Sequence, residues 1–279
     1  MRVEVVGQLS ASYEGPFGVT VAVDDRVYVA DDEGHRIYEF DAKHRLVSTL
    51  GKKGNQPGEF AWVDGVAVDP EGNLYVSDTG NNRLQVLDRR GGFLRQFGRS
   101  GSRSGEFANP RGITLDEDLL LYVADWGNHR VQVLDRDGKF IRQLGGSGKR
   151  MGEFQNPIAL HAGRQRRLYV CDFKNHRIQI FDRAGKVVGV FGKKGTGDGE
   201  LQLPSGITQD REGRLYVVEY GNHRIQVFSE EGGHLGGFGR DSKTGPPLRE
   251  PTSVAFNSRS ELYVVDKGNK RVLVYRVSL

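Results

Sequence analysis

Six acidic residues and six arginines recur along the chain at one fixed spacing, and side chains of these types can perform acid–base chemistry or bind a metal ion. The acidic series is Asp31, Asp78, Asp125, Asp172, Glu219 and Asp266, and the arginine series is Arg36, Arg83, Arg130, Arg177, Arg224 and Arg271. Both series step by 47 residues. Because residues placed identically in every copy serve a role that every copy needs, we interpret them as structural. We expect them to fix a turn by charge-assisted hydrogen bonds where neighbouring units meet.

Three histidines, His129, His176 and His223, share one position in the repeat and therefore do not converge on a single site. We expect neither catalysis nor metal binding from them. The single cysteine, Cys171, stands where other copies carry Ala, Ser or Val, so we expect a packed thiol. One cysteine allows no intramolecular disulfide, which favours a reducing compartment, and we expect a cytoplasmic protein.

The repeated unit has the sequence pattern of short strands joined by turns. In the copy that spans residues 98–145 we predict strands at 112–116, 120–125, 130–134 and 140–144. In the second and third of these, large apolar residues alternate with small or polar ones, which is the two-residue period of a sheet. The 39 glycines and the scarcity of helix formers agree with an all-β chain.

A strict 47-residue period over the whole chain indicates one supersecondary unit copied six times. Four-stranded antiparallel units arranged around a channel form a β-propeller, so we predict a single domain, residues 1–279, with six blades. The last copy ends after its third strand, and residues 2–7 match the fourth-strand pattern of residues 93–98. We therefore predict that residues 1–8 complete the sixth blade and close the ring. We expect the isolated domain to be a monomer, and no run of 18 apolar residues suggests a membrane partner.

The innermost strand of each predicted blade would line the channel, where some six-bladed enzymes of other families hold a metal ion with acidic side chains. No acidic set occupies these strands, and only His161 and Gln209 interrupt their bland composition. Neither a hydrolytic triad nor an oxygen-ligand cage can be assembled from them. We therefore expect no enzymatic activity, no cofactor and no metal.

Functional residues are better sought at positions that differ from copy to copy, because a shared structural need does not explain them. The position after the repeated acid carries Asp32, Thr79, Trp126, Phe173, Tyr220 and Lys267. A second variable position, near the start of the innermost strand, carries Phe17, Asp64, Arg111, Ile158, Ser205 and Thr252. By the up-and-down order of the strands, both series share one face with long loops that hold Lys149, Arg150, Lys193 and Lys194.

Aromatic rings among cations are typical of proteins that bind single-stranded nucleic acid, because bases stack on the rings and phosphates meet the cations. The same loops also carry glutamates, which dilute the positive field, and the net charge of +4 permits polyanion binding without arguing for it. Clusters of Trp, Tyr and Arg equally mark protein-binding hot spots, and some of the rings could simply pack between blades. The residues alone leave RNA binding, protein binding and packing open.

Three copies carry an Asn-His-Arg triplet followed by Val/Ile-Gln-Val/Ile, at residues 128–130, 175–177 and 222–224, and these segments resemble NHL repeats. The loop at 101–112, Gly-Ser-Arg-Ser-Gly-Glu-Phe-Ala-Asn-Pro-Arg-Gly, carries the same resemblance. Over essentially the whole chain, the regular copies are similar to the C-terminal NHL domains of animal tripartite-motif proteins. That resemblance implies an RNA-binding module in post-transcriptional regulation. The alternative function is a protein-binding platform that recruits partners or substrates for a ubiquitin ligase. The ligase activity itself would come from a RING region in a longer parent protein.

The resemblance also implies roles for individual residues of the variable face. Bases would stack on, or be walled off by, Trp126, Phe173 and Tyr220, and Arg111 would reach a base edge or a phosphate. Phe17 occupies another of the family's recognition positions. From the residues themselves we expect backbone contacts from Lys149, Arg150, Lys193 and Lys194, and we include Lys267 in the site. Negative charge lies on the first, second and sixth sectors, at Asp32, Asp64 and Asp241, so we expect an RNA path to favour blades 3–5.

Overall fold

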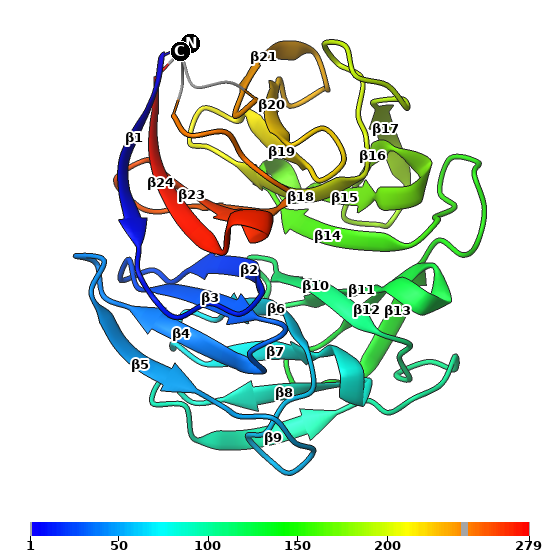
Figure 1. Ribbon diagram of the computed structural model, residues 1–279. Helices are drawn as coiled ribbons and strands as arrows, with labels where there is room; N and C mark the ends of the chain where they lie inside the picture. Colours follow the sequence, from blue (N-terminus) through cyan, green and yellow to red (C-terminus); the bar gives the residue numbers. More distant parts are fainter. Residues whose placement is uncertain (1, 241–244, 279) are drawn as a thin grey trace.

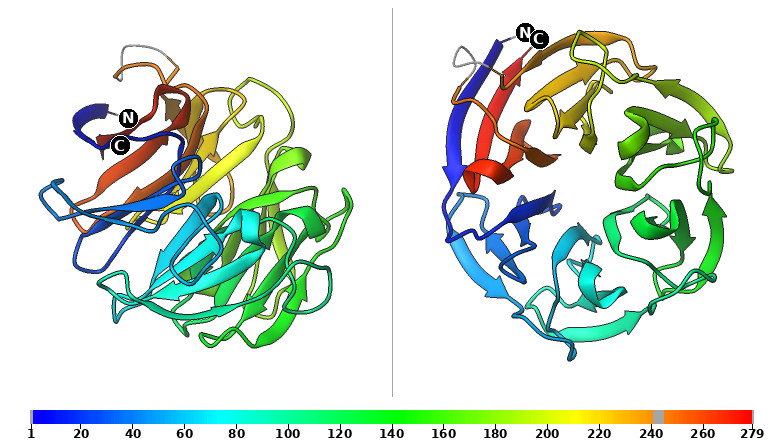
Figure 2. Two further views of the ribbon diagram at one scale, coloured as in Figure 1. Left: turned by 60° about the horizontal axis from the view of Figure 1, so that its bottom comes forward. Right: turned by 45° about the vertical axis from the view of Figure 1, so that its right-hand side comes forward.

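The computed structural model describes residues 2–240 and 245–278, which form a ring of six four-stranded antiparallel sheets. Figure 1 shows the course of the chain through successive blades, and the right-hand view of Figure 2 shows the blades arranged around a central channel. This architecture confirms the all-β, six-bladed propeller expected from the 47-residue period. No helix in the described ranges is long and apolar enough to cross a membrane.

Each of blades 1–5 is built from four consecutive strands, with the first beside the channel and the fourth at the rim. Blade 1 comprises β2 (Pro16–Val21), β3 (Val27–Asp31), β4 (Arg36–Phe40) and β5 (Leu46–Leu50). Blade 2 comprises β6 (Val63–Val68), β7 (Leu74–Asp78), β8 (Arg83–Leu87) and β9 (Phe93–Phe97). Blade 3 comprises β10 (Pro110–Leu115), β11 (Leu121–Asp125), β12 (Arg130–Leu134) and β13 (Phe140–Leu144). Blade 4 comprises β14 (Pro157–Ala162), β15 (Leu168–Asp172), β16 (Arg177–Phe181) and β17 (Val187–Phe191). Blade 5 comprises β18 (Pro204–Gln209), β19 (Leu215–Glu219), β20 (Arg224–Phe228) and β21 (His234–Phe238). Single 3-10 turns occur at Thr79–Asn81, Trp126–Asn128, Arg164–Arg166, Phe173–Asn175 and Lys267–Asn269.

The sixth blade joins the two ends of the described chain. It contains β22 (Pro251–Phe256), β23 (Glu261–Asp266) and β24 (Arg271–Ser278), and β1 (Arg2–Leu9) is its outermost strand. β1 and β24 run antiparallel and lie side by side in Figure 1, with Val3 opposite Val277 and Gln8 opposite Leu273. The N-terminal strand therefore closes the ring, as predicted from its match to the fourth-strand pattern.

The hydrophobic core is divided into six clusters, each shared by two neighbouring blades. Between blades 4 and 5, for example, Tyr169 and Ile178 pack with Leu215 and Phe228. Cys171 belongs to this cluster, is fully buried, and has a thiol pKa raised by burial, which confirms the packed thiol. Because each cluster needs both of its blades, apolar burial stabilises the closed ring rather than any single blade.

The repeated acid and arginine join the turn between the second and third strands to the loop that leads into the same blade. The carboxylate of Asp125, fully buried, accepts hydrogen bonds from Arg130 Nε at 2.7 Å and Gln132 Nε2 at 3.1 Å. It also accepts one from the loop N–H of Ala108 at 2.7 Å, while Arg130 Nη2 donates to the carbonyl of Glu106 at 2.8 Å. The acids and arginines of blades 2–6 form this ion pair, which confirms the structural interpretation of the series. Blade 1 is an exception, because Arg36 pairs with Glu14 at 3.0 Å while Asp31 accepts hydrogen bonds from the N–H groups of Gly15 and Gly34.

The histidines of the triplets have a role that the sequence did not reveal. Nδ1 of His129 accepts a hydrogen bond from the N–H of Asn156 in the loop of the next blade, at 3.1 Å. The same contact joins four other pairs of blades, through Trp62 to His35, Asn109 to Asn82, Leu203 to His176 and Glu250 to His223. At the seam between blades 6 and 1 the equivalent residue is Lys270, which has no acceptor, and an ion pair between Lys267 and Asp32 bridges the blades instead.

Candidate functional site

The two variable series lie on one face of the ring, as expected. The turn that carries Trp126 contacts the loop that enters the same blade, where the N–H of Gly127 donates to the carbonyl of Ala108 at 2.8 Å. We call this side the loop face. It holds the turns between second and third strands and the long loops between blades.

Three aromatic side chains of neighbouring blades form a continuous row on the loop face, which we call the aromatic arc: Trp126, Phe173 and Tyr220. Ring centroids are 5.3 Å apart between Trp126 and Phe173 and 6.4 Å apart between Phe173 and Tyr220, with the planes inclined by 56° and 59°. All three rings are partly buried. Trp126 and Phe173, with Phe17 from blade 1, pack against the cluster that contains Ile158, so their positions are fixed by contacts on one side.

The other side of the channel mouth carries alternating charges. Lys267 Nζ lies 2.6 Å from Asp32 Oδ2, and Arg111 Nη1 lies 3.1 Å from Asp64 Oδ2. Both cations also contact the ring of Phe17, with Lys267 Nζ at 5.0 Å and Arg111 Cζ at 5.5 Å from its centroid. We call Asp32, Asp64, Arg111 and Lys267 the charged arc. Its two cations each face a carboxylate of this chain, so they add donors to the mouth but little net charge.

Burial perturbs the carboxylates of the charged arc. Burial raises the pKa of Asp64 to about 6, although the neighbouring Arg111 guanidinium opposes the shift. The pKa of Asp32 is also raised by burial, against the hydrogen bond from Lys267. Among the described residues, Asp32 Oδ1 and Arg111 Nε are buried without a hydrogen-bond partner, and Asp64 Oδ2 has the ion pair with Arg111 but no hydrogen bond. This cluster therefore keeps unused hydrogen-bonding capacity.

Arg111 connects the two arcs. Its guanidinium carbon lies 4.4 Å from the Trp126 ring centroid, a cation–π distance, and 26% of its side chain is exposed. The aromatic arc thus begins beside the planar guanidinium of Arg111, which is held in place by the Asp64 carboxylate and by the Trp126 ring.

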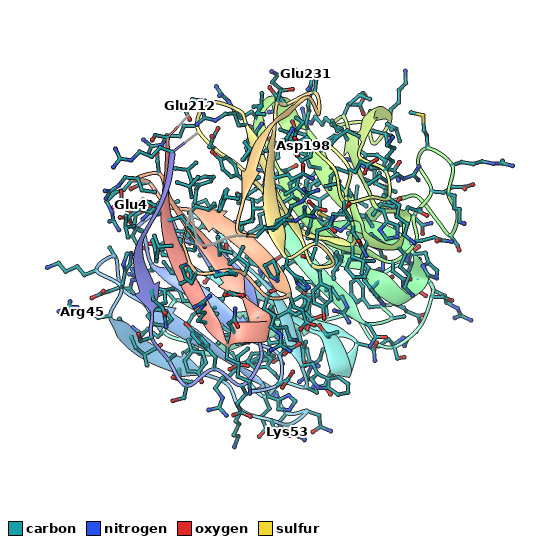
Figure 3. The ribbon with its side chains drawn as sticks, turned by 45° about the horizontal axis from the view of Figure 1, so that its top comes forward. Glu4, Arg45, Lys53, Asp198, Glu212 and Glu231 are labelled. Atoms are coloured by element: carbon teal, nitrogen blue, oxygen red, sulfur yellow. The ribbon has the colours of Figure 1, made fainter. Side chains whose placement is uncertain are left out.

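The loops around the aromatic arc carry the expected cations. Lys149, Arg150 and Lys194 are exposed, and no ion pair involves them within the described residues. Lys193 lies 3.5 Å from Glu200, so its charge is partly compensated. Asp241, which was expected to place negative charge on the sixth sector, lies outside the described residues. Figure 3 shows Lys53, in the equivalent loop before blade 2, pointing away from the body of the ring.

Sequence reasoning missed one cation of this site. Lys174 follows Phe173 on the turn of blade 4, is exposed, and has its Nζ 5.9 Å from the Trp126 ring centroid. A signal was present, because blades 2, 3, 5 and 6 carry glycine at this register, at Gly80, Gly127, Gly221 and Gly268.

The central channel has a volume of about 340 Å³ and is lined by the innermost strands of all six blades. Asp64, at the loop-face mouth, is the one acidic side chain among the described lining residues. No group of three or more His, Cys, Asp or Glu side chains in residues 2–240 and 245–278 is placed to hold a metal ion. His161 and Gln209 lie in the lining near the opposite mouth.

Four segments of the chain match the NHL repeat, at residues 60–87, 107–134, 154–181 and 201–228. The chain is a six-bladed β-propeller that contains four NHL repeats. Each matched segment of this NHL propeller runs from the phenylalanine or leucine of the loop through the first three strands of one blade. A search of curated proteins gives no match.

Solved structures of other propellers are similar to this NHL propeller over its whole length. A streptogramin B lyase is 17% identical with a TM-score of 0.71, covering 100% of this chain and 99% of the lyase. Virginiamycin B lyase from Staphylococcus aureus, in a catalytically inactive form with quinupristin, is 17% identical with a TM-score of 0.69 over 97% and 84% of the two chains. The WD40 β-propeller domain of Doa1 is 13% identical with a TM-score of 0.68 over 99% and 97%. At these identities the likeness shows the fold alone.

The lyases overturn one expectation from the sequence, that this chain is not an enzyme. We excluded catalysis because the channel lining offers neither a triad nor a metal cage, and that exclusion is wrong. Lyases share the fold, so the propeller architecture is compatible with catalysis. The physical reason is that a fold does not determine function, and the absence of two familiar arrangements leaves other chemistry open.

Proposed function

We propose that the loop face of this NHL propeller binds single-stranded RNA, or the single-stranded part of a stem-loop, and acts in post-transcriptional regulation. One observation carries this proposal. The aromatic arc of Trp126, Phe173 and Tyr220 is continuous, partly exposed and bordered by Lys149, Arg150 and Lys194, for which no ion pair occurs within the described residues.

The geometry suits unstacked bases. Because neighbouring rings of the arc are inclined by more than 50°, each offers its own face or edge to a separate base. Stacking of one base on an aromatic ring contributes about 1–3 kcal/mol. The exposed cations, including Lys174 and, in part, Lys193, would meet the phosphates, and this electrostatic contribution would weaken with salt.

Arg111 would have a different role from the lysines. Since Asp64 already compensates its charge, Arg111 contributes oriented N–H donors rather than net attraction for phosphate. A donor held over Trp126 is suited to an acceptor on the edge of a base that stacks on the arc. The acidic side of the mouth, with Asp32 and Asp64, would keep the RNA on blades 3–5.

A second function, a protein-binding platform, is favoured by two exposed apolar side chains. Trp62 and Met151, both in loops of the loop face, are 55% and 66% exposed. Several loop cations are paired with loop glutamates, as in Lys52 with Glu59 at 3.3 Å and Arg99 with Glu106 at 2.9 Å. Such a surface would recruit partners or ubiquitylation substrates, as in the tripartite-motif proteins whose NHL domains this chain resembles.

Selection from a random single-stranded RNA pool at low and at physiological salt tests the first function. We expect enrichment of a short motif, with affinity that falls as salt rises. The absence of any enriched motif at both salt concentrations contradicts RNA recognition and leaves the protein platform as the better account.

A further inference from the structure

The face opposite the loop face differs between blades in a way that the RNA proposal does not use. This opposite face holds the turns between the first and second strands. At the second position of that turn, blades 4 and 5 carry Arg164 and Arg211, whereas the other blades carry Val23, Pro70, Glu117 and Ser258. Two arginines therefore lie on adjacent blades at one mouth of the channel.

Both arginines are held in place by contacts to the next blade. Arg164 Nη1 donates to the carbonyl of Arg211 at 2.7 Å, and Arg211 Nη2 donates to the carbonyl of Ser258. Both side chains are exposed, and neither forms an ion pair within residues 2–240 and 245–278. Each guanidinium is anchored by one nitrogen, and its remaining N–H groups are available to an anion.

The nearby acidic groups already have partners. Asp210 is 2.6 Å from Arg214 Nε, and Asp25 accepts hydrogen bonds from the N–H and the hydroxyl of Ser258. These carboxylates therefore do not neutralise Arg164 and Arg211 by direct contact.

A cavity begins at the two arginines and continues toward the channel. It has a volume of about 350 Å³, and Arg164 and Arg211 line it together with Gln209 and Phe256. Gln209 and Phe256 also line the central channel, so the two spaces adjoin. On the loop face, Phe17 and Arg111 contact each other across the mouth, so we infer that a ligand would enter from the opposite face.

The channel wall next to this cavity carries His161, which together with Gln209 interrupts the otherwise small and apolar side chains expected along the innermost strands. Its ring lies 6.5 Å from that of Tyr169, and neither ring nitrogen has a hydrogen-bond partner within the described residues. Burial lowers its pKa to about 4, so the imidazole is neutral at physiological pH and offers one donor and one acceptor. These nitrogens can therefore exchange hydrogen bonds with a ligand that enters the channel.

Blade 4 has a local change that shapes this corner. Three other blades begin the same turn with aspartate, at Asp69, Asp116 and Asp210, whereas blade 4 has Gly163. A Cβ at residue 163 would lie 2.7 Å from Gln209 Oε1, which accepts a hydrogen bond from the N–H of Arg164 at 2.9 Å. Glycine thus removes an acid and lets Gln209 position the turn that carries Arg164.

We propose that the opposite mouth of the channel, between blades 4 and 5, binds a small organic carboxylate. Arg164 and Arg211 hold the carboxylate, and the uncharged body of the ligand enters the channel beside His161. Paired N–H donors match a carboxylate well, and the volume is in the range of small-molecule sites. Val, Ile and Phe side chains among the lining residues would contact the uncharged body of the ligand.

Titration of the full chain with benzoate, followed through the imidazole NMR signals of ¹³C-labelled histidine, tests this proposal. The His161 signal is assigned from its loss in His161→Gln. We expect a saturable shift of that signal at millimolar benzoate, and no shift with benzyl alcohol, which has the same ring without the charge. An absent shift with benzoate, or an equal shift with benzyl alcohol, overturns the proposal.

A double variant identifies the arginines as the anion site. Arg164→Gln with Arg211→Gln keeps a side-chain N–H donor for the anchoring carbonyls and removes both charges, and we expect benzoate affinity to fall at least about tenfold. Lys149→Ala with Lys194→Ala, on the loop face, is the matched control and should bind benzoate like the wild type. Unchanged affinity in a folded arginine variant contradicts the assignment, whatever the outcome of the RNA experiments.

Discussion

Nδ1 of His129 accepts a hydrogen bond from the backbone N–H of Asn156, 3.1 Å away on the next blade. His35, His176 and His223 make the same contact, and Asn82 makes it with an amide oxygen that does not titrate. A protonated imidazole has no acceptor, so these four contacts between blades require the neutral ring. The repeat position that defines the triplet is therefore a link between blades.

The link at His176 predicts that stability falls in acid. For His176, burial and the nearby Lys194 lower the pKa. A lowered folded-state pKa means that the contribution is present above the unfolded-state value, about 6.5, and is lost as the pH falls through the folded-state value. We expect His176→Asn to lose less thermal stability than the wild type between about pH 7 and pH 5. Identical pH profiles would exclude the His176 link as the cause.

Asp64 predicts a pH dependence of opposite sign. Burial raises its pKa from 3.8 to about 6, so its contribution to stability is present below the unfolded-state value and is lost as the pH rises through 6. We expect the free energy of unfolding of Asp64→Asn, measured in urea, to rise by about 2 kcal/mol relative to that of the wild type between about pH 4 and about pH 7. A difference in unfolding free energy that stays constant across this range would contradict a buried carboxyl group with a raised pKa.

Closure of the ring by β1 predicts the effect of a truncation. Deletion of residues 1–8 removes most of the strand that pairs with β24 and exposes the edge of the sixth blade. We expect a lower thermal midpoint, with partial recovery when a synthetic peptide of residues 1–9 is added. A truncated protein with the thermal midpoint of the wild type would refute the closure.

The repeated acid predicts a large loss of stability. Asp125→Ala leaves Arg130, which is 6% exposed, without its carboxylate partner, and we expect a loss of about 3–5 kcal/mol in urea unfolding. Lys149→Ala, at an exposed residue of the loop between blades 3 and 4, is the control and should change stability by less than about 0.5 kcal/mol. A loss below about 1 kcal/mol for Asp125→Ala would contradict a structural role.

The periodic features of the sequence predicted the periodic features of the fold. The six blades, the closing strand, the common face of the two variable series and the Asp125–Arg130 contact all follow from positions that repeat every 47 residues. Contacts between the variable side chains of neighbouring blades could not be predicted in the same way. Arg111 and Asp64 occupy equivalent positions, but their pairing depends on side-chain conformations at a channel mouth where several partners were in reach.

Two further features illustrate different reasons for a missed prediction. The histidine links were missed because their partner is a backbone N–H, which the sequence does not mark. The enzyme exclusion was wrong because it rested on the two arrangements that we tested for, and lyases with the same fold show that such a test does not exclude catalysis.

Affinity for the selected RNA in the variant Phe173→Ala with Tyr220→Ala, measured by fluorescence anisotropy at two salt concentrations, tests the central claim most directly. Trp62→Ala is the matched control, because Trp62 is an exposed aromatic residue of the loop face outside the arc. We predict that the double variant, shown to be folded by its thermal transition, loses at least about tenfold in affinity at both salt concentrations, and that Trp62→Ala binds like the wild type. Wild-type affinity in the folded double variant would contradict recognition of RNA by the aromatic arc.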